Sequence, residues 1–130
     1  MRTIMIVDDE QNVLDGLRRT LSWAHETRVL TCSDPNAALA LASQENVDLF
    51  ICDYQMPHMN GVGFLVFVRE LHPQASRFLS RGGDDFRGLA SAINLAGIHR
   101  FISKPVEPDE LLFIADQALS QRRSRVREAL

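Results

Sequence analysis

The chain has 130 residues, of which 45% are hydrophobic and 24% are charged, as in an ordinary soluble domain with a single core. Its formal net charge of −3 provides no overall attraction to nucleic acid or to anionic lipid. No apolar run approaches the roughly 20 residues of a membrane span, and Met1 leads into a strand-like segment without a signal peptide. We therefore expect one cytoplasmic domain that contacts neither nucleic acid directly nor a membrane.

Short apolar runs alternate with amphipathic segments of helical length along the whole chain. This alternation is typical of a parallel sheet covered by helices on both faces, so the sequence predicts an α/β fold with a doubly wound sheet. Asp34 and Pro35 mark the start of one helix as its cap and first turn. The predicted strands are 3–7, 27–32, 47–52, 77–80 and 98–103, and the predicted helices are 13–23, 34–44, about 61–71, about 86–96, and 107 onward.

Charged residues follow four of the five predicted strands: Asp8 and Asp9, then Asp53, then Arg81, then Lys104. Doubly wound sheets bind ligands outside the carboxyl ends of their strands, so the chemistry should lie at these positions. If the first and third strands are neighbours, about 4.8 Å apart, the three aspartates can reach one cation. Such close carboxylates repel each other, and Mg²⁺ favours oxygen ligands of this kind.

An aspartate can also act as a nucleophile and take up a phosphoryl group. Phosphoryl transfer depends mainly on positioning and on cations that neutralise the phosphoryl oxygens. Lys104 should lie two strands from Asp53, about 10 Å away at the backbone, which its side chain largely covers. The pattern therefore predicts a phosphoacceptor pocket.

Three segments, "VDDE", "ICDYQMPHMNG" and "FISKP", resemble the signatures of the receiver domains of bacterial two-component response regulators. The resemblance covers residues 2–120 and implies a flavodoxin-like (βα)5 fold whose five parallel strands have the order 2-1-3-4-5. It implies that Asp53 is the phosphoacceptor, that Lys104 contacts the phosphoryl group, and that Mg²⁺ is bound by Asp8, Asp9, Asp53 and the backbone carbonyl of Gln55.

The resemblance extends to several supporting positions. Pro57 and Gly61 match the loop after the acceptor, and Pro105 matches a proline whose preceding bond is usually cis. Phe101 matches an aromatic position that packs in or out as these domains switch, although a plain core aromatic is an alternative.

Arg81 departs from the family pattern. Counting back without gaps from Lys104 places residue 81 where the family has Ser or Thr, whose hydroxyl contacts the phosphoryl group. Our preferred hypothesis is that Arg81 occupies this site, where its guanidinium could form a fork with Asp53 or its phosphoryl oxygens. In a second hypothesis the strand bulges and presents Ser80 instead. In a third, Arg81 points to solvent.

The stretch "RGGDDF" (81–86) also resembles the Gly-Gly-acidic-acidic-Phe signature of diguanylate cyclases. In that family the signature forms an antiparallel hairpin within a domain longer than this chain. Here the glycines follow a predicted parallel strand, and Asp84 and Asp85 precede a predicted helix, whose N-terminal dipole favours acidic residues. The context therefore argues against a cyclase.

The last predicted helix could continue past the receiver-like part. Residues 121–130 are expected to form a helical extension, or a linker to an output domain, and its apolar spacing could pair two copies as a homodimer. The segment "AINLAGIHRFISKPVEPDEL" resembles receivers that precede cyclic-di-GMP phosphodiesterases and related enzymes. The expected partners are a histidine kinase or phosphotransfer protein and an output domain or effector.

Three functions compete. The first is a two-component signalling switch, not an enzyme acting on an external substrate, that takes phosphate from a histidine kinase onto Asp53 with Mg²⁺. The second is a receiver-like interaction module that phosphorylation does not switch, with Arg81 holding one state. The third is a magnesium-dependent phosphohydrolase, which would need two aspartates spaced two residues apart after the first strand, unlike Asp8-Asp9-Glu10.

Overall fold

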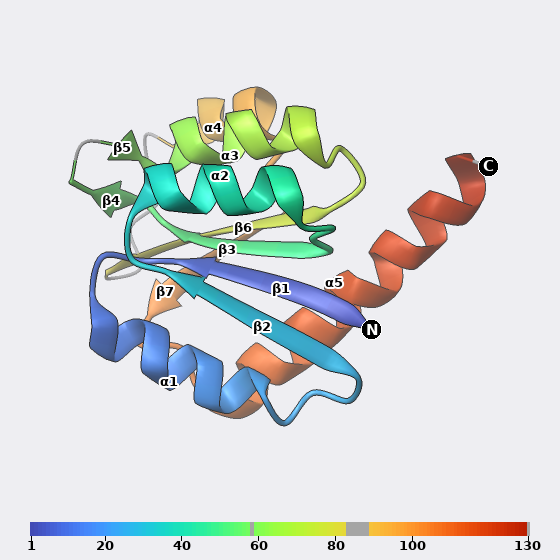
Figure 1. Ribbon diagram of the computed structural model, residues 1–130, viewed down its shortest axis with the longest axis horizontal. Helices are drawn as coiled ribbons and strands as arrows, with labels where there is room; N and C mark the ends of the chain where they lie inside the picture. The colour runs from blue at the N-terminus through green and yellow to red at the C-terminus, as the bar shows by residue number, and fades with distance from the viewer. Residues whose placement is uncertain (58, 83–88, 130) are drawn as a thin grey trace.

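The computed structural model describes residues 1–57, 59–82 and 89–129, with side chains as far as Gln121. Strands and helices alternate along most of the chain (Figure 1). In chain order the elements are β1 (Arg2–Val7), α1 (Gln11–Leu21), β2 (Thr27–Cys32), α2 (Pro35–Gln44), β3 (Leu49–Asp53), β4 (Gln55–Met56), β5 (Met59–Asn60), α3 (Gly61–Leu71), β6 (Ser76–Gly82), α4 (Ala90–Ala96), β7 (Arg100–Lys104) and α5 (Pro108–Ala129).

The main sheet has five strands in the order β2-β1-β3-β6-β7, and all of its pairs are parallel. In terms of its main strands this is the order 2-1-3-4-5, so the predicted topology is confirmed. The strand order reverses between β1 and β3, and the carboxyl ends of both strands therefore open onto the same edge of the sheet.

Two apolar layers hold the sheet between helices. On one face, Leu14 of α1 and Leu111 of α5 belong to one buried apolar cluster with Ile51 of β3. On the other face, Phe64 of α3 lies edge-on to Phe50 of β3, with ring centroids 6.2 Å apart. Figure 1 shows α2, α3 and α4 together on this second side. Because β3 contributes to both layers, all five of its residues are buried, which explains its nearly continuous apolar sequence.

Several boundaries differ from the sequence predictions, most of them by one or two residues. β3 begins at Leu49, not at residue 47, and includes Asp53. β6 continues through Gly82, because its last residues pair with β7. β7 begins at Arg100, two residues later than predicted. The predicted fourth helix began near residue 86; α4 begins at Ala90, and 83–88, with the predicted caps Asp84 and Asp85, lie outside the described residues.

The short antiparallel pair β4 and β5 was not predicted, since two-residue strands have no periodicity to detect. Helix α5 continues to Ala129, and its final turns extend past the sheet (Figure 1). In the part of the chain that is described, no helix is both long and apolar enough to cross a membrane.

Candidate functional site

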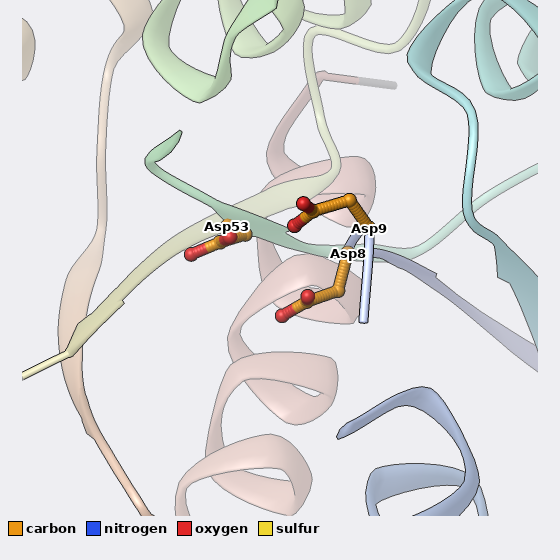
Figure 2. Close-up of side chains that lie close together, drawn as sticks. All are labelled: Asp8, Asp9 and Asp53. Atoms are coloured by element: carbon orange, nitrogen blue, oxygen red, sulfur yellow. The ribbon is translucent and has the colours of Figure 1, made fainter. Parts of the chain in front are cut away.

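Three aspartates meet at the carboxyl edge of the sheet. Asp8 and Asp9 directly follow β1, and Asp53 is the last residue of the adjacent β3. One carboxylate oxygen from each lies within 4.8 Å of the others. Figure 2 shows the three side chains directed toward the same side of this edge. Asp8 and Asp53 are buried, with 1% and 6% of their surface exposed, while Asp9 is open to solvent.

Lys104, at the end of β7, reaches across the sheet edge to this cluster. Its Nζ lies 2.8 Å from Asp8 Oδ2 and 3.0 Å from Asp53 Oδ1. Asp8 Oδ1 accepts a hydrogen bond from the Glu10 backbone N–H at 2.9 Å, which fixes the carboxylate at the start of α1. The peptide bond between Lys104 and Pro105 is cis, as the family resemblance implies.

The cluster shifts the protonation of its own members. Burial raises the pKa of the Asp53 carboxyl above its ordinary value of 3.8, and although Lys104 lowers this pKa, the negative charge of Asp8 raises it again. For Lys104 burial acts to lower the pKa, but the close contacts with Asp8 and Asp53 outweigh burial, so the pKa lies above its ordinary value of 10.5. The lysine is therefore held charged between two carboxylates.

The donor set fits a divalent metal ion. Magnesium prefers oxygen ligands and is typically held by one or two carboxylates together with phosphate oxygens and water. Asp8 Oδ2 is buried and, among the described residues, has no directed hydrogen-bond partner beyond its ion pair with Lys104. A buried carboxylate oxygen with spare acceptor capacity, next to the solvent-exposed Asp9, is suited to a cation that keeps part of its water shell.

The loop after Asp53 is tied closely to the acceptor strand. The Gly61 N–H donates to the Tyr54 carbonyl at 2.8 Å, and the Tyr54 N–H donates to the Ser80 carbonyl at 2.8 Å. A Cβ on Gly61 would overlap the backbone carbonyl of Asp53, so this position requires glycine. Pro57 lies between β4 and β5, within the loop that this contact closes.

A cavity of about 350 Å³ opens beside the cluster. Arg81 is half-buried at its wall, and the guanidinium carbon lies 5.3 Å from the centre of the Tyr54 ring. The guanidinium therefore packs against an aromatic ring in this structure, and the role of Arg81 stays a prediction. The lining residues are Asp9, Glu10, Asp53, Gln55, Arg81, Gly82 and Lys104.

Arg81 and Ser80 are adjacent in β6, so their side chains face opposite sides of the sheet. The pairing of β6 with β7 is uninterrupted from Phe78 to Gly82, so the proposed bulge is absent from this strand. Ser80 is the register partner of Asp53, and its hydroxyl donates to the Cys52 carbonyl at 3.5 Å. It lines a different cavity of about 560 Å³ between α1 and α5, to which Lys104 also contributes.

Two further aromatic residues lie close in sequence to Asp53 and Lys104. Phe101 is partly buried against the core layer that contains Phe64. Tyr54 packs against the same layer and carries the Arg81 guanidinium on its ring. Sequence reasoning missed Tyr54, although its position directly after the acceptor was a signal that could have identified it. Glu10, at the border of the cavity, was missed too.

These features define the class of protein: a doubly wound domain with an acidic cluster and a lysine at its switch point. The sequence model of the response regulator receiver domain matches residues 4–116. The chain belongs to this family, whose members act in two-component systems. Residues 81 and 82 lie in a strand paired in parallel with β7, unlike the antiparallel hairpin of the cyclase signature.

Relatives and solved structures agree with this assignment. The chain is 41% identical over 117 residues to the hydrogenase transcriptional regulatory protein HoxA of Cupriavidus necator, covering 90% of this chain and 24% of that protein. It thus spans about a quarter of the length of such curated relatives.

The fold is also similar to the signal receiver domain of an HD domain-containing protein from Pseudomonas fluorescens Pf-5, with a TM-score of 0.87, 32% identity and coverage of 95% and 98% of the two chains. NtrX from Brucella abortus gives a TM-score of 0.88 at 25% identity, covering 99% of this chain and 30% of that one.

Proposed function

We propose that this chain is a phosphorylation-operated switch in which Asp53 accepts the phosphoryl group. The observation that carries the proposal is the contact of one lysine with two carboxylates, Lys104 Nζ to Asp8 Oδ2 at 2.8 Å and to Asp53 Oδ1 at 3.0 Å. This contact supports the proposal because it sets a cation beside the carboxylate that would become the acyl phosphate.

In the proposed reaction a carboxylate oxygen of Asp53 attacks the phosphorus of a phosphohistidine on a partner kinase or phosphotransfer protein. The new O–P bond forms as the N–P bond breaks, and the imidazole leaves with the electron pair and takes a proton from solvent. A nucleophile requires the ionised carboxylate, and the contact with Lys104 favours this form because it lowers the pKa of Asp53 that burial raises. Lys104 would hold the transferred phosphoryl oxygens.

Magnesium would be held by the side chains of Asp8, Asp9 and Asp53 and by the backbone carbonyl of Gln55, which borders the cavity. When bound, it neutralises charge on the phosphoryl oxygens. The protein residues position the reacting groups. Asp8 keeps Lys104 in place, and Gly61 allows the loop to close against the Asp53 carbonyl.

Arg81 would act as a second cation for the phosphoryl group. Its position on the wall of the cavity that Asp53 also lines gives this cavity a planar, permanently charged group where a family member has a neutral hydroxyl. Guanidinium groups bind phosphate oxygens through paired hydrogen bonds, so Arg81 could replace the lost hydroxyl contact.

The test is phosphorylation with a small donor. Incubation with Mg²⁺ and acetyl phosphate should add the mass of one phosphoryl group to the intact protein, and Asp53→Asn should abolish this addition. Asp34→Asn is the matched control, because Asp34 caps α2 by accepting the Asn36 N–H, a role asparagine fills equally well. A label that persists in Asp53→Asn would refute Asp53 as acceptor.

A second candidate is an interaction module of the same fold that phosphorylation does not switch. The permanent charge of Arg81 at the cavity favours it, since this charge could hold one state without phosphate. The absence of label with acetyl phosphate, phosphoramidate and a panel of histidine kinases would support this candidate. Turnover of phosphoesters would instead indicate a phosphohydrolase and contradict our view that the chain is not an enzyme.

The proposed setting is a cytoplasmic phosphorelay with a histidine kinase or phosphotransfer protein upstream. The output would be a further domain or a separate effector. HoxA is described as a transcriptional regulator, and the Pseudomonas relative carries an HD domain, so relatives of this chain serve different outputs. An output linked to cyclic-di-GMP, and pairing of two copies through the extended α5, are both parts of this proposal.

A further inference from the structure

Arg81 and Tyr54 form a contact that links the acidic cavity to the helices beyond it. The guanidinium carbon lies 5.3 Å from the Tyr54 ring centre, within the range of a cation–π interaction. Arg81 and Asp53 both line the acidic cavity, where Lys104 Nζ lies 3.0 Å from Asp53 Oδ1. In the unphosphorylated chain the guanidinium is therefore held by an aromatic ring at the border of a negatively charged site.

Tyr54 also borders a cavity other than the acidic one. Tyr54 is only partly buried and borders a second cavity of about 290 Å³. This cavity is formed by the starts of α3 and α4, and its other lining residues are Asn60, Val62, Gly63, Leu89, Ser91 and Ala92. The backbone of Tyr54 is fixed to β6 through the Ser80 carbonyl, so a movement at this residue would be a movement of its ring.

Phosphorylation of Asp53 would offer Arg81 a second partner, the phosphoryl group, in competition with the Tyr54 ring. A phosphoryl group brings additional negative charge and several acceptor oxygens into the cavity. Paired, charge-assisted hydrogen bonds to these oxygens are stronger than the attraction of a guanidinium to a ring that solvent can reach. Arg81 would then leave Tyr54.

We propose that Arg81 and Tyr54 form a latch with two positions, an inference that rests on the proposed phosphoacceptor function of Asp53. Without phosphate the guanidinium lies on the ring and holds it beside the acidic cavity. With phosphate the guanidinium turns to the phosphoryl oxygens, and the ring repacks toward Leu89 and Ala92 at the start of α4. The surface formed by α3 and α4 then differs between the two states.

Tyr54 is the only tyrosine in the sequence, which gives a direct experiment. Protein grown with 3-fluorotyrosine carries one ¹⁹F signal, which reports on this ring alone. Addition of Mg²⁺ and acetyl phosphate should shift the signal by more than its linewidth in the same sample whose intact mass shows the phosphoryl group. Arg81→Gln should move the signal of the unphosphorylated protein toward the phosphorylated position and lose most of the further shift.

Arg100→Gln is the matched control, because Arg100 is exposed at the opposite end of β7 and should leave both signals unchanged. If Arg81→Gln does not fold, Arg81→Lys keeps a cation and should give a resting signal like that of the wild type with a smaller phosphate-induced shift. A phosphorylated wild type whose signal does not move overturns the latch but not the phosphoacceptor. Failure of the wild type to gain the phosphoryl mass overturns the proposed function, and the latch with it.

Discussion

The ends of β1, β3 and β7 differ from the end of β6 in how their charges are arranged. At the first three ends, Asp8, Asp53 and Lys104 satisfy one another within 3.0 Å. At the end of β6, the Arg81 guanidinium packs on the Tyr54 ring at the wall of the acidic cavity. Charges that are paired at short distance form a fixed site, whereas a cation held by a weaker partner can be redirected. The two regions should therefore respond differently to mutation.

The largest effect is expected at Lys104, which joins the fixed charges. Lys104→Met should leave the buried Asp8 and Asp53 carboxylates without their cation and lower the free energy of unfolding at neutral pH by about 2 kcal/mol, with some discount for partial exposure. The rate of labelling by acetyl phosphate should fall roughly 100-fold. Urea unfolding and intact mass measure the two effects.

Lys104→Arg, which keeps the charge, is the control and should retain most of the stability. Lys104 is the only lysine of the chain, so reductive ¹³C-methylation can follow its titration directly. Because its pKa is raised, the stability it contributes is complete below pH 10.5 and is lost as the pH rises through the raised value. A Lys104→Met variant as stable as the wild type would contradict the ion-pair account.

The metal-binding proposal predicts the next largest effect. Asp9 is exposed and makes no contact with Lys104 among the described ion pairs, so Asp9→Asn should affect the metal more than the fold. We expect Mg²⁺ affinity to fall about 30-fold and the Mg²⁺-induced rise in unfolding temperature to shrink accordingly. Thermal unfolding across a Mg²⁺ series measures this, with Asp34→Asn as control. Equal Mg²⁺ responses in all three proteins would argue against Asp9 as a ligand.

Much of the ion-paired site at the ends of β1, β3 and β7 was predictable from sequence alone. Asp8, Asp53 and Lys104 each follow an apolar run, and parallel strands bring such positions to one edge of the sheet whatever the exact strand boundaries. The alternation of strands and helices predicted the architecture for the same reason. Gly61 was predicted from the family resemblance, but its cause, the closeness of the Asp53 carbonyl, is a tertiary contact that no local pattern contains.

The end of β6, which carries Arg81, was harder to predict because it depends on strand register. Gly82 and the glycine after it suggested a loop, yet pairing with Lys104 extends β6 through Gly82 and makes Arg81 a strand residue. Alternate residues of a strand face opposite sides, so Arg81 shares the face of Leu79, toward the layer that includes Tyr54, and Ser80 shares that of Phe78. Sequence could identify these residues but not which face each occupies.

A comparison of Arg81→Gln with Ser80→Ala tests this assignment of faces. If the guanidinium contacts the phosphoryl group, Arg81→Gln should slow labelling by acetyl phosphate about tenfold, the equivalent of one lost charge-assisted contact of roughly 1.4 kcal/mol. Ser80→Ala should slow it less than about threefold, because the hydroxyl already donates to the Cys52 carbonyl. The reverse ranking would indicate that the Ser80 hydroxyl, and not Arg81, contacts the phosphoryl group.

The smallest effect is expected from the acceptor itself, measured as stability in the absence of metal. The raised pKa of Asp53 means that folding disfavours its charged form, so Asp53→Asn should increase the free energy of unfolding at pH 7. A raised carboxyl pKa means that the native state binds the proton more tightly than the unfolded state does. The charged carboxylate therefore lowers the free energy of unfolding at neutral pH, and this loss of stability disappears as the pH falls toward 3.8. The difference between the two proteins should therefore shrink in urea titrations at pH 4.5, while Asp34→Asn matches the wild type at both pH values. An Asp53→Asn protein less stable than the wild type at pH 7 would show that the attraction of Lys104 exceeds the combined cost of burial and the neighbouring aspartates.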